Sequence, residues 1–265
     1  MPFTLSHAAA SLPFRRFKPV WPALVIGTFA PDLQYFILIS DEDRSGHRFP
    51  EVLLYTIPLA LLVLWVFESM VKRPAIELLP SGLQRRLQDK TESLSFSGWD
   101  QFGLIVLWIV VGIATHVVWD QFTHGYSWLA SRWALLQTML HLPLVHPITV
   151  SHLLQHISTI GGALVLAAWV RGWYRRTSPG PVSEEEFSTR LKTAVVLTMG
   201  TIAALAGYPI ATWRLAHHPP PIKLEFVVVT TFVAIAMVFC TQLLIYGVAI
   251  TLSTRARHSP ATQPD

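Results

Sequence analysis

The sequence predicts an all-α integral membrane protein, a helical bundle with about six transmembrane helices. Hydrophobic residues make up 52% of the 265-residue chain and charged residues only 14%, whereas a soluble domain usually carries about 25% charged residues. The apolar residues come in long runs, and a helix needs about 20 of them to cross the hydrocarbon core of a bilayer. No run has the alternation of a barrel strand, so helices remain as the way to span lipid.

Six apolar runs are predicted to span the membrane. The second and sixth are the most uniformly apolar, the first and third carry polar residues, and the fourth is short. Together they are expected to form a single membrane domain over residues 1–265. The predicted spans cover residues 21–40, 51–71, 101–122, 153–171, 193–213 and 224–251.

The distribution of positive charge predicts the orientation. Most of the 20 Lys and Arg residues fall before the first span, after the second and fourth spans, and in the tail. Because loops on the inner side carry the excess of Lys and Arg, six spans place both termini inside, in the cell membrane. The net charge of +4 is then explained by the membrane surface, with membrane lipids as partners and no nucleic acid.

Three of the segments outside the predicted spans have features of their own. Residues 1–20 are expected to be interfacial or re-entrant, because their short apolar stretch cannot cross. The inner loop 72–100 contains an amphipathic, basic stretch that suits an anionic leaflet, and the tail 253–265 is expected to be disordered. The single cysteine, Cys240, excludes a disulfide framework and a cysteine-based zinc finger.

The end of the third span carries a pattern typical of a metal site. His116, Asp120 and His124 recur every four residues, and each such step turns a helix by a net angle of about 40°. The three side chains therefore share one stripe, and imidazole and carboxylate groups are ligands for zinc and similar cations. The alternative is a polar helix end with two interfacial histidines and a capping aspartate.

Two further candidate ligands come from earlier parts of the chain. Asp32 follows Pro31 inside the first apolar run, where proline interrupts the helical hydrogen bonds and a buried carboxylate needs a cation or donors. It is predicted to be a metal ligand or a cap on the broken helix. His47, in an acidic outer loop, is expected on the same side as His116; its alternative is a solvated loop histidine.

The remaining candidates are three histidines. The charge distribution places His7 inside, whereas the His116 stripe lies near the outer end of its span. Either the opening segment folds into the bundle, or His7 is not a ligand. His152 and His156 form another pair four residues apart, and they are either interfacial histidines or weaker metal ligands.

Four blocks of sequence resemble a known family. They are PFTLSHAAASLP, LVIGTFAPDLQYF, an isolated His before an apolar span, and THVVWDQFTH. In this order they resemble the domain-of-unknown-function 4184 family of multi-pass bacterial membrane proteins. More distantly, the order His, Gly-x-x-x-Pro-Asp, His, His-x-x-x-Asp is similar to the zinc-dependent phospholipase C and single-strand nuclease group, and to membrane-bound metal-dependent hydrolases.

The distant resemblance implies a set of zinc ligands. Residues that match ligand positions are His7, Asp32, His47, His116 and Asp120, with an approximate match at His124. The zinc enzymes also use a His-x-x-x-Glu pair, whose nearest counterpart here is His152 with His156, and the amino group of a processed N-terminus, for which this chain shows no obvious cleavage site.

The expected function is therefore hydrolysis of a phosphoester, such as a phospholipid or a lipid-linked phosphate, with Asp32 and Asp120 as catalytic carboxylates and zinc as cofactor. Two other functions remain open. A non-catalytic membrane protein could use the same residues for a structural metal or polar cluster. An ion or solute transporter would use Asp32 in a cation path, although polar residues are concentrated in the first and third spans.

Overall fold

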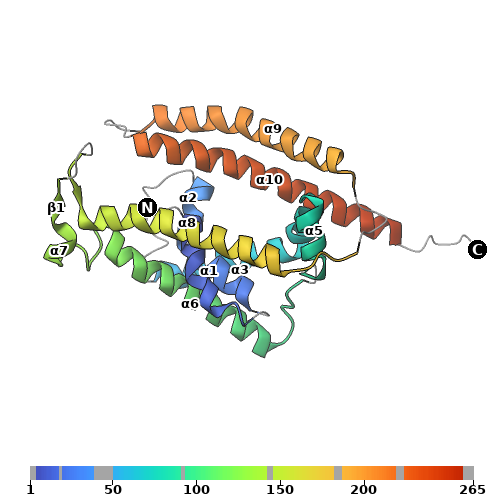
Figure 1. Ribbon diagram of the computed structural model, residues 1–265, viewed down its shortest axis with the longest axis horizontal. Helices are drawn as coiled ribbons and strands as arrows, with labels where there is room; N and C mark the ends of the chain where they lie inside the picture. The colour runs from blue at the N-terminus through green and yellow to red at the C-terminus, as the bar shows by residue number, and fades with distance from the viewer. Residues whose placement is uncertain are drawn as a thin grey trace, which may run out of the picture. The chain divides into compact units, whose positions relative to one another are not determined.

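The structure, a computed structural model, is shown in Figure 1 and describes residues 4–17, 20–38, 50–90, 93–141, 146–181, 187–218 and 224–258. The described residues are almost entirely helical, apart from one short hairpin of β1 (Met139–Leu140) and β2 (Ile148–Thr149). Five helices are long and apolar enough to cross a membrane. The predicted all-α membrane fold is confirmed. Those helices are Val52–Glu77, Trp99–Thr123, Val150–Arg176, Thr189–Ala216 and Phe226–Ser253.

The prediction of six spans is corrected to five in the described part of the chain. The expected first span divides into α1 (Trp21–Phe29), the 3-10 turn η2 (Ala30–Asp32) and α2 (Leu33–Leu38). Pro31 lies within that turn, and its ring removes a backbone donor and clashes with the preceding turn. The placement of both termini on the inner side assumed six crossings and stays a prediction.

The helix Val52–Glu77 consists of two π segments, η4 (Val52–Thr56) and η5 (Phe67–Val71), together with α3 (Ile57–Val66) and α4 (Lys72–Glu77). The inner loop forms α5 (Ser81–Leu87) and the turn η6 (Gln88–Lys90). The other elements are η1 (Thr4–Phe14), α6 (Trp99–Thr123), α7 (Ala134–Gln137), α8 (Val150–Arg176), α9 (Thr189–Ala216) and α10 (Leu224–His258).

The chain divides into two compact units. The first contains residues 1–33, 43–64 and 94–176, and its core is a cluster of small and branched side chains from α1, α3 and α6. Gly27 of α1 faces Gly112 of α6 so closely that a Cβ added to Gly112 would lie 2.5 Å from the Leu24 carbonyl oxygen. Small residues allow membrane helices this kind of approach, and here it brings α1 and η2 against the end of α6.

The second unit contains residues 34–42, 65–93 and 177–265. Its helices α9 and α10 pack along one another, with Gly207 so close to Ile235 that an added Cβ would lie 2.8 Å from its Cα atom. Lys72 donates to the buried carboxylate of Glu68 over 2.9 Å. Helix α10 extends to His258, so the expected disordered tail is helical at its start; residues 259–265 lie outside the described part.

Candidate metal centre

The C-terminal end of α6 carries two of the predicted ligands side by side. His116 is fully buried and Asp120 nearly so, and one helical turn brings the His116 Nε2 atom to 3.3 Å from Asp120 Oδ2. The predicted stripe is therefore present, and it faces the interior of the first unit.

The proline turn brings a second carboxylate to the same place. Asp32 is fully buried, and its Oδ1 atom lies 3.5 Å from His116 Nε2. Its other oxygen, Oδ2, accepts a hydrogen bond from the Thr4 hydroxyl at 2.7 Å. Because η2 interrupts the helix at Pro31, Asp32 enters the protein interior opposite α6.

The opening segment of the chain folds into the first unit as the 3-10 helix η1, which packs against α1 and α8. Besides the bond from Thr4 to Asp32, the Ser6 hydroxyl donates to the Thr159 carbonyl at 2.9 Å, and the Trp21 indole donates to the Ser11 carbonyl at 3.2 Å. As a result His7 is buried. Of the two alternatives left open by the sequence, the structure shows the one in which this segment joins the bundle.

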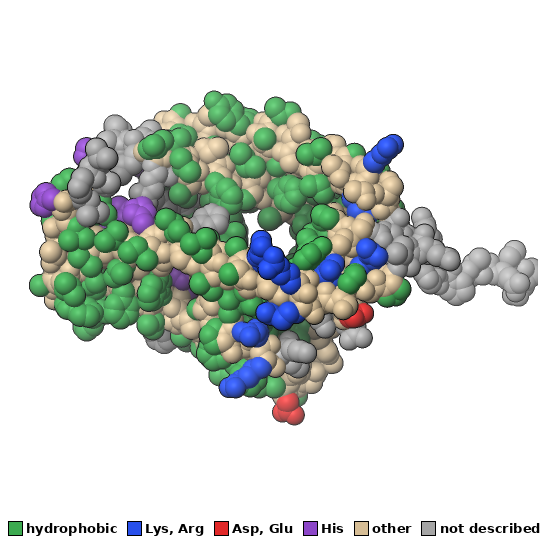
Figure 2. All heavy atoms as spheres, in the orientation of Figure 1, with side chains coloured by type: hydrophobic (Ala, Val, Ile, Leu, Met, Phe, Trp, Pro, Cys, Tyr) green, Lys and Arg blue, Asp and Glu red, His purple; other side chains and the backbone are tan. Residues whose placement is uncertain are grey.

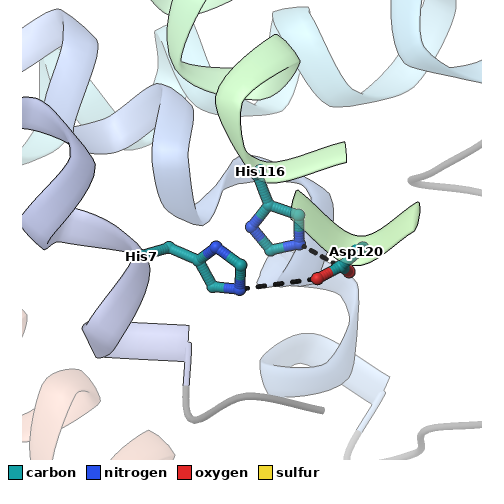
Figure 3. Close-up of side chains that lie close together, drawn as sticks. All are labelled: His7, His116 and Asp120. Atoms are coloured by element: carbon teal, nitrogen blue, oxygen red, sulfur yellow. Dashed lines mark ion pairs between the residues drawn. The ribbon is translucent and has the colours of Figure 1, made fainter. Parts of the chain in front are cut away.

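Three side chains then converge, as Figure 3 shows. The Nε2 atom of His7 lies 3.6 Å from Asp120 Oδ1, and the His7 and His116 rings stack with centroids 3.9 Å apart. His7, His116 and Asp120 each offer a ligand atom, and all three atoms lie within 4.8 Å of one another. This buried group can hold a metal ion.

A backbone carbonyl determines which nitrogen of His116 faces the carboxylates. The Nδ1 atom lies 2.8 Å from the carbonyl oxygen of Thr28, which can only accept a hydrogen bond, so Nδ1 carries the proton. In the neutral ring Nε2 then presents its lone pair toward Asp32 and Asp120. A metal-bound histidine has the same arrangement, with its other N–H donated to a carbonyl or carboxylate.

The spacing of these donors also fits a shared cation. Zinc binds imidazole nitrogen and carboxylate oxygen at about 2.0–2.2 Å in a tetrahedral arrangement, which separates neighbouring ligand atoms by about 3.4 Å. The nitrogen–oxygen distances around His116 are 3.3 and 3.5 Å. The residues therefore fit a divalent cation by both donor type and spacing.

His124 lies beside this group in a different role from the other histidines. It caps α6, and its Nδ1 atom lies 3.3 Å from the Asp120 carbonyl oxygen and 3.6 Å from Asp120 Oδ1. That nitrogen also lies 3.2 Å from the Thr123 hydroxyl. His124 is thus placed to orient Asp120 at the helix end, and direct ligation by His124 stays a prediction.

The other predicted ligands are not part of the three-residue group. His47 lies outside the described residues. His152 and His156, at the start of α8, stack on each other with ring centroids 4.6 Å apart, and His156 is exposed. They form a separate pair, and their metal binding stays a prediction.

A comparison with known protein families shows to which family the chain belongs. The model of the domain of unknown function DUF4184 matches residues 1–248. The chain belongs to this family. The match covers all five membrane-spanning helices except the last residues of the fifth, as well as the candidate ligands. No significant match was found among curated proteins or among solved structures.

Sequence reasoning did not identify two residues of this DUF4184 protein that position its candidate ligands. Thr4 bonds Asp32, and Thr28 bonds His116 through its backbone carbonyl. Neither threonine has a spacing pattern that would single it out, since each acts on a residue far along the chain. Only the packing of η1 and α1 against α6 reveals them.

Proposed function

We propose that this membrane protein is a metal-dependent phosphoester hydrolase whose centre contains His7, Asp32, His116 and Asp120. The observation that supports it is the convergence of two imidazoles and two carboxylates, all buried, at nitrogen–oxygen distances of 3.3 to 3.6 Å. Ionisable groups in membrane segments are expensive and usually functional. The mixed nitrogen and oxygen donor set favours zinc.

His7, Asp32, His116 and Asp120 would hold a divalent cation, which would supply a coordinated water of lowered pKa and positive charge beside a phosphoryl group. The protein's own residues supply position and proton transfer. Thr4 fixes one oxygen of Asp32, so the other oxygen is held toward His116, where it can accept a proton from the attacking water. The Thr28 carbonyl holds the His116 ring in one tautomer.

The place of the centre favours a lipid substrate. It lies at the end of α6, one of the membrane-spanning helices, and the segment that follows exposes several aromatic side chains. A phosphoester at the surface of the cell membrane is therefore within its reach. We assign a phospholipid or a lipid-linked phosphate as the substrate class.

The test combines metal content with turnover. The detergent-purified protein should contain about one or two equivalents of zinc, the range expected of hydrolytic zinc sites, and in proteoliposomes it should release phosphate or a phosphorylated headgroup. Asp120→Asn and His116→Ala should lose both metal and turnover. The control is Asp100→Asn, in the exposed first turn of the same helix, which should keep both. Unchanged zinc in Asp120→Asn would overturn the proposal.

A structural metal is the second candidate, because the site joins three segments that are distant in the sequence: η1, η2 and the end of α6. A cation that only clamps these segments would raise the thermal midpoint of unfolding without any turnover. Zinc-loaded protein that is inactive on a panel of phospholipids and lipid-linked phosphates, with an unfolding midpoint that depends on zinc, would select this candidate.

A further inference from the structure

The segment between α6 and α8 exposes large apolar side chains although it belongs to neither helix. We call residues 125–141 the aromatic segment. The exposed fractions of its large apolar side chains range from 46% at Trp133 to 66% at Trp128, and Figure 2 shows hydrophobic side chains gathered around α7. The other large exposed side chains are Tyr126, Leu135 and Met139.

This exposure is built into a well-packed segment. The side chain of Gln137 donates to the Gly125 and Ala130 carbonyls at 2.8 and 2.9 Å. Gln121 of α6 accepts from the Leu129 amide at 3.3 Å. Within the segment itself, the side chains of Ala130 and Leu136 are buried. Backbone groups of the segment are thus bonded to glutamine side chains of the protein, whereas its largest rings are exposed. A loop that faces water usually does not expose a group of large apolar side chains.

The position of the segment identifies what covers those rings. It follows the end of α6 and belongs to the connection from α6 to α8, two membrane-spanning helices, so it begins at the surface of the bilayer. Trp and Tyr are enriched at that surface, where the ring is buried among lipid and its polar edge meets water. A second protein is not needed to explain the exposed rings, because the bilayer is already adjacent.

The charge of the segment complements a phosphate group. The sequence has no acidic residue between Asp120 and Glu184, and Arg132 is the single Lys or Arg between positions 91 and 170. The guanidinium of Arg132 lies over the Trp128 ring, 4.9 Å from its centroid, and donates to the Trp128 carbonyl at 3.1 Å. These two contacts hold the exposed guanidinium of Arg132 beside the Trp128 ring.

The aromatic segment is also in contact with the candidate metal centre. The Tyr126 ring packs edge-on against His124, with centroids 5.2 Å apart. His124 in turn lies 3.6 Å from Asp120 Oδ1. A molecule lying on the exposed side of Tyr126 is therefore only two side chains from the buried carboxylate.

We propose that the aromatic segment is a phospholipid-docking surface: Trp128, Trp133 and Leu135 insert among the lipids, and Arg132 binds the headgroup phosphate of an anionic phospholipid. The docked lipid lies next to Tyr126, at the edge of the metal centre. This deepens the proposed function, on which the role of the lipid as substrate rests, while docking itself needs neither metal nor turnover.

The test measures lipid contact directly in the full chain reconstituted in nanodiscs. In a Cys240→Ser background, which removes the single cysteine, a fluorophore is attached to Leu135→Cys. Nitroxide-labelled lipids should quench it, and aqueous iodide should not. The control is Ser178→Cys in the exposed loop after α8, which should respond to iodide. Quenching of the Leu135 label by iodide alone would overturn the docking surface, whatever the metal content.

The headgroup assignment has its own readout. At equal mole fractions, nitroxide phosphatidylglycerol should occupy the site next to the label roughly fivefold more often than nitroxide phosphatidylcholine, the preference expected of one basic residue near an anionic lipid. Arg132→Gln should abolish this preference, and Arg132→Lys should retain it. A preference that survives Arg132→Gln would remove the assignment of Arg132 to phosphate. Loss of catalysis with intact quenching would count against the hydrolase and not against docking.

Discussion

The imidazole of His7 stacks on that of His116, with ring centroids 3.9 Å apart and planes inclined by 22°. Both rings turn Nε2 toward one carboxylate, that of Asp120, at 3.6 and 3.3 Å. A short 3-10 segment at the start of the chain thus supplies half of the imidazole pair. The integrity of the centre should therefore depend on the packing of η1 against α8.

Gly162→Ala should weaken metal binding although it changes no ligand. A Cβ at this position would lie 2.8 Å from the Ser6 Cβ and 2.9 Å from its carbonyl oxygen, so η1 must shift away from α8 and carry His7 out of its place beside His116. We expect roughly a 10-fold to 100-fold loss of zinc affinity, the range seen when groups that orient a ligand are lost.

The adjacent glycine provides the matched control. A Cβ on Gly161 would meet nothing within 4 Å, so Gly161→Ala should bind zinc as the wild type does. Zinc affinity is measured by competition with a chromogenic chelator. Equal affinities for the two alanine variants would show that the seating of η1 against α8 does not matter for the centre.

Thr4→Val should also lower zinc affinity, because it removes the 2.7 Å hydrogen bond that holds Asp32 Oδ2. Loss of such an orienting bond typically costs 10-fold to 100-fold in affinity. Thr4→Ser keeps the hydroxyl and should restore binding close to the wild-type value. If the serine variant binds as weakly as the valine variant, the hydroxyl is not the group responsible.

Removal of metal should lower the thermal midpoint of unfolding. A ligand present at about 1,000 times its dissociation constant stabilises the folded state by about 4 kcal/mol. EDTA should therefore lower the midpoint by several degrees, and added zinc should restore it. In Asp120→Asn neither addition should have an effect. A midpoint that is insensitive to EDTA in the zinc-containing wild type would mean that the cation does not stabilise the folded state.

Gly112→Ala should destabilise the first unit, since a Cβ at that position would lie 2.7 Å from Gly27 Cα and would force α6 away from α1. Overpacking of this kind usually costs 1–3 kcal/mol. Gly103→Ala on the same helix meets open space and should be neutral or slightly stabilising, because alanine favours helix over glycine. Chemical denaturation in detergent, followed by circular dichroism, compares the two variants.

The predicted stripe on α6 could be found from the sequence because helical geometry alone relates residues four positions apart. The same rule marked His116 and Asp120 as neighbours, and the structure places them 3.3 Å apart. Proline chemistry is equally local: Pro31 was predicted to interrupt the hydrogen bonds of the first span, and in the structure the turn η2 separates α1 from α2.

The place of His7 could not be predicted from the sequence. The distribution of charge assigns each loop to one side of the membrane, but it does not show whether a short terminal segment folds back into the bundle. That outcome depends on the close approach of Ser6 to Gly162 and on the bond to the Thr159 carbonyl, which are contacts between distant parts of the chain. Thr4 and Thr28 escaped notice for the same reason.

By itself, the sequence determined that this is a helical membrane protein, because long apolar runs must be helical in lipid, and that His116, Asp120 and His124 share one stripe, because helical periodicity places them there. The tertiary structure alone decided that Asp32 and His7 join that stripe. Their convergence depends on the glycine contact between α1 and α6 and on the packing of η1 against α8. Both are contacts between residues that are distant in the sequence, so a local sequence pattern cannot predict them.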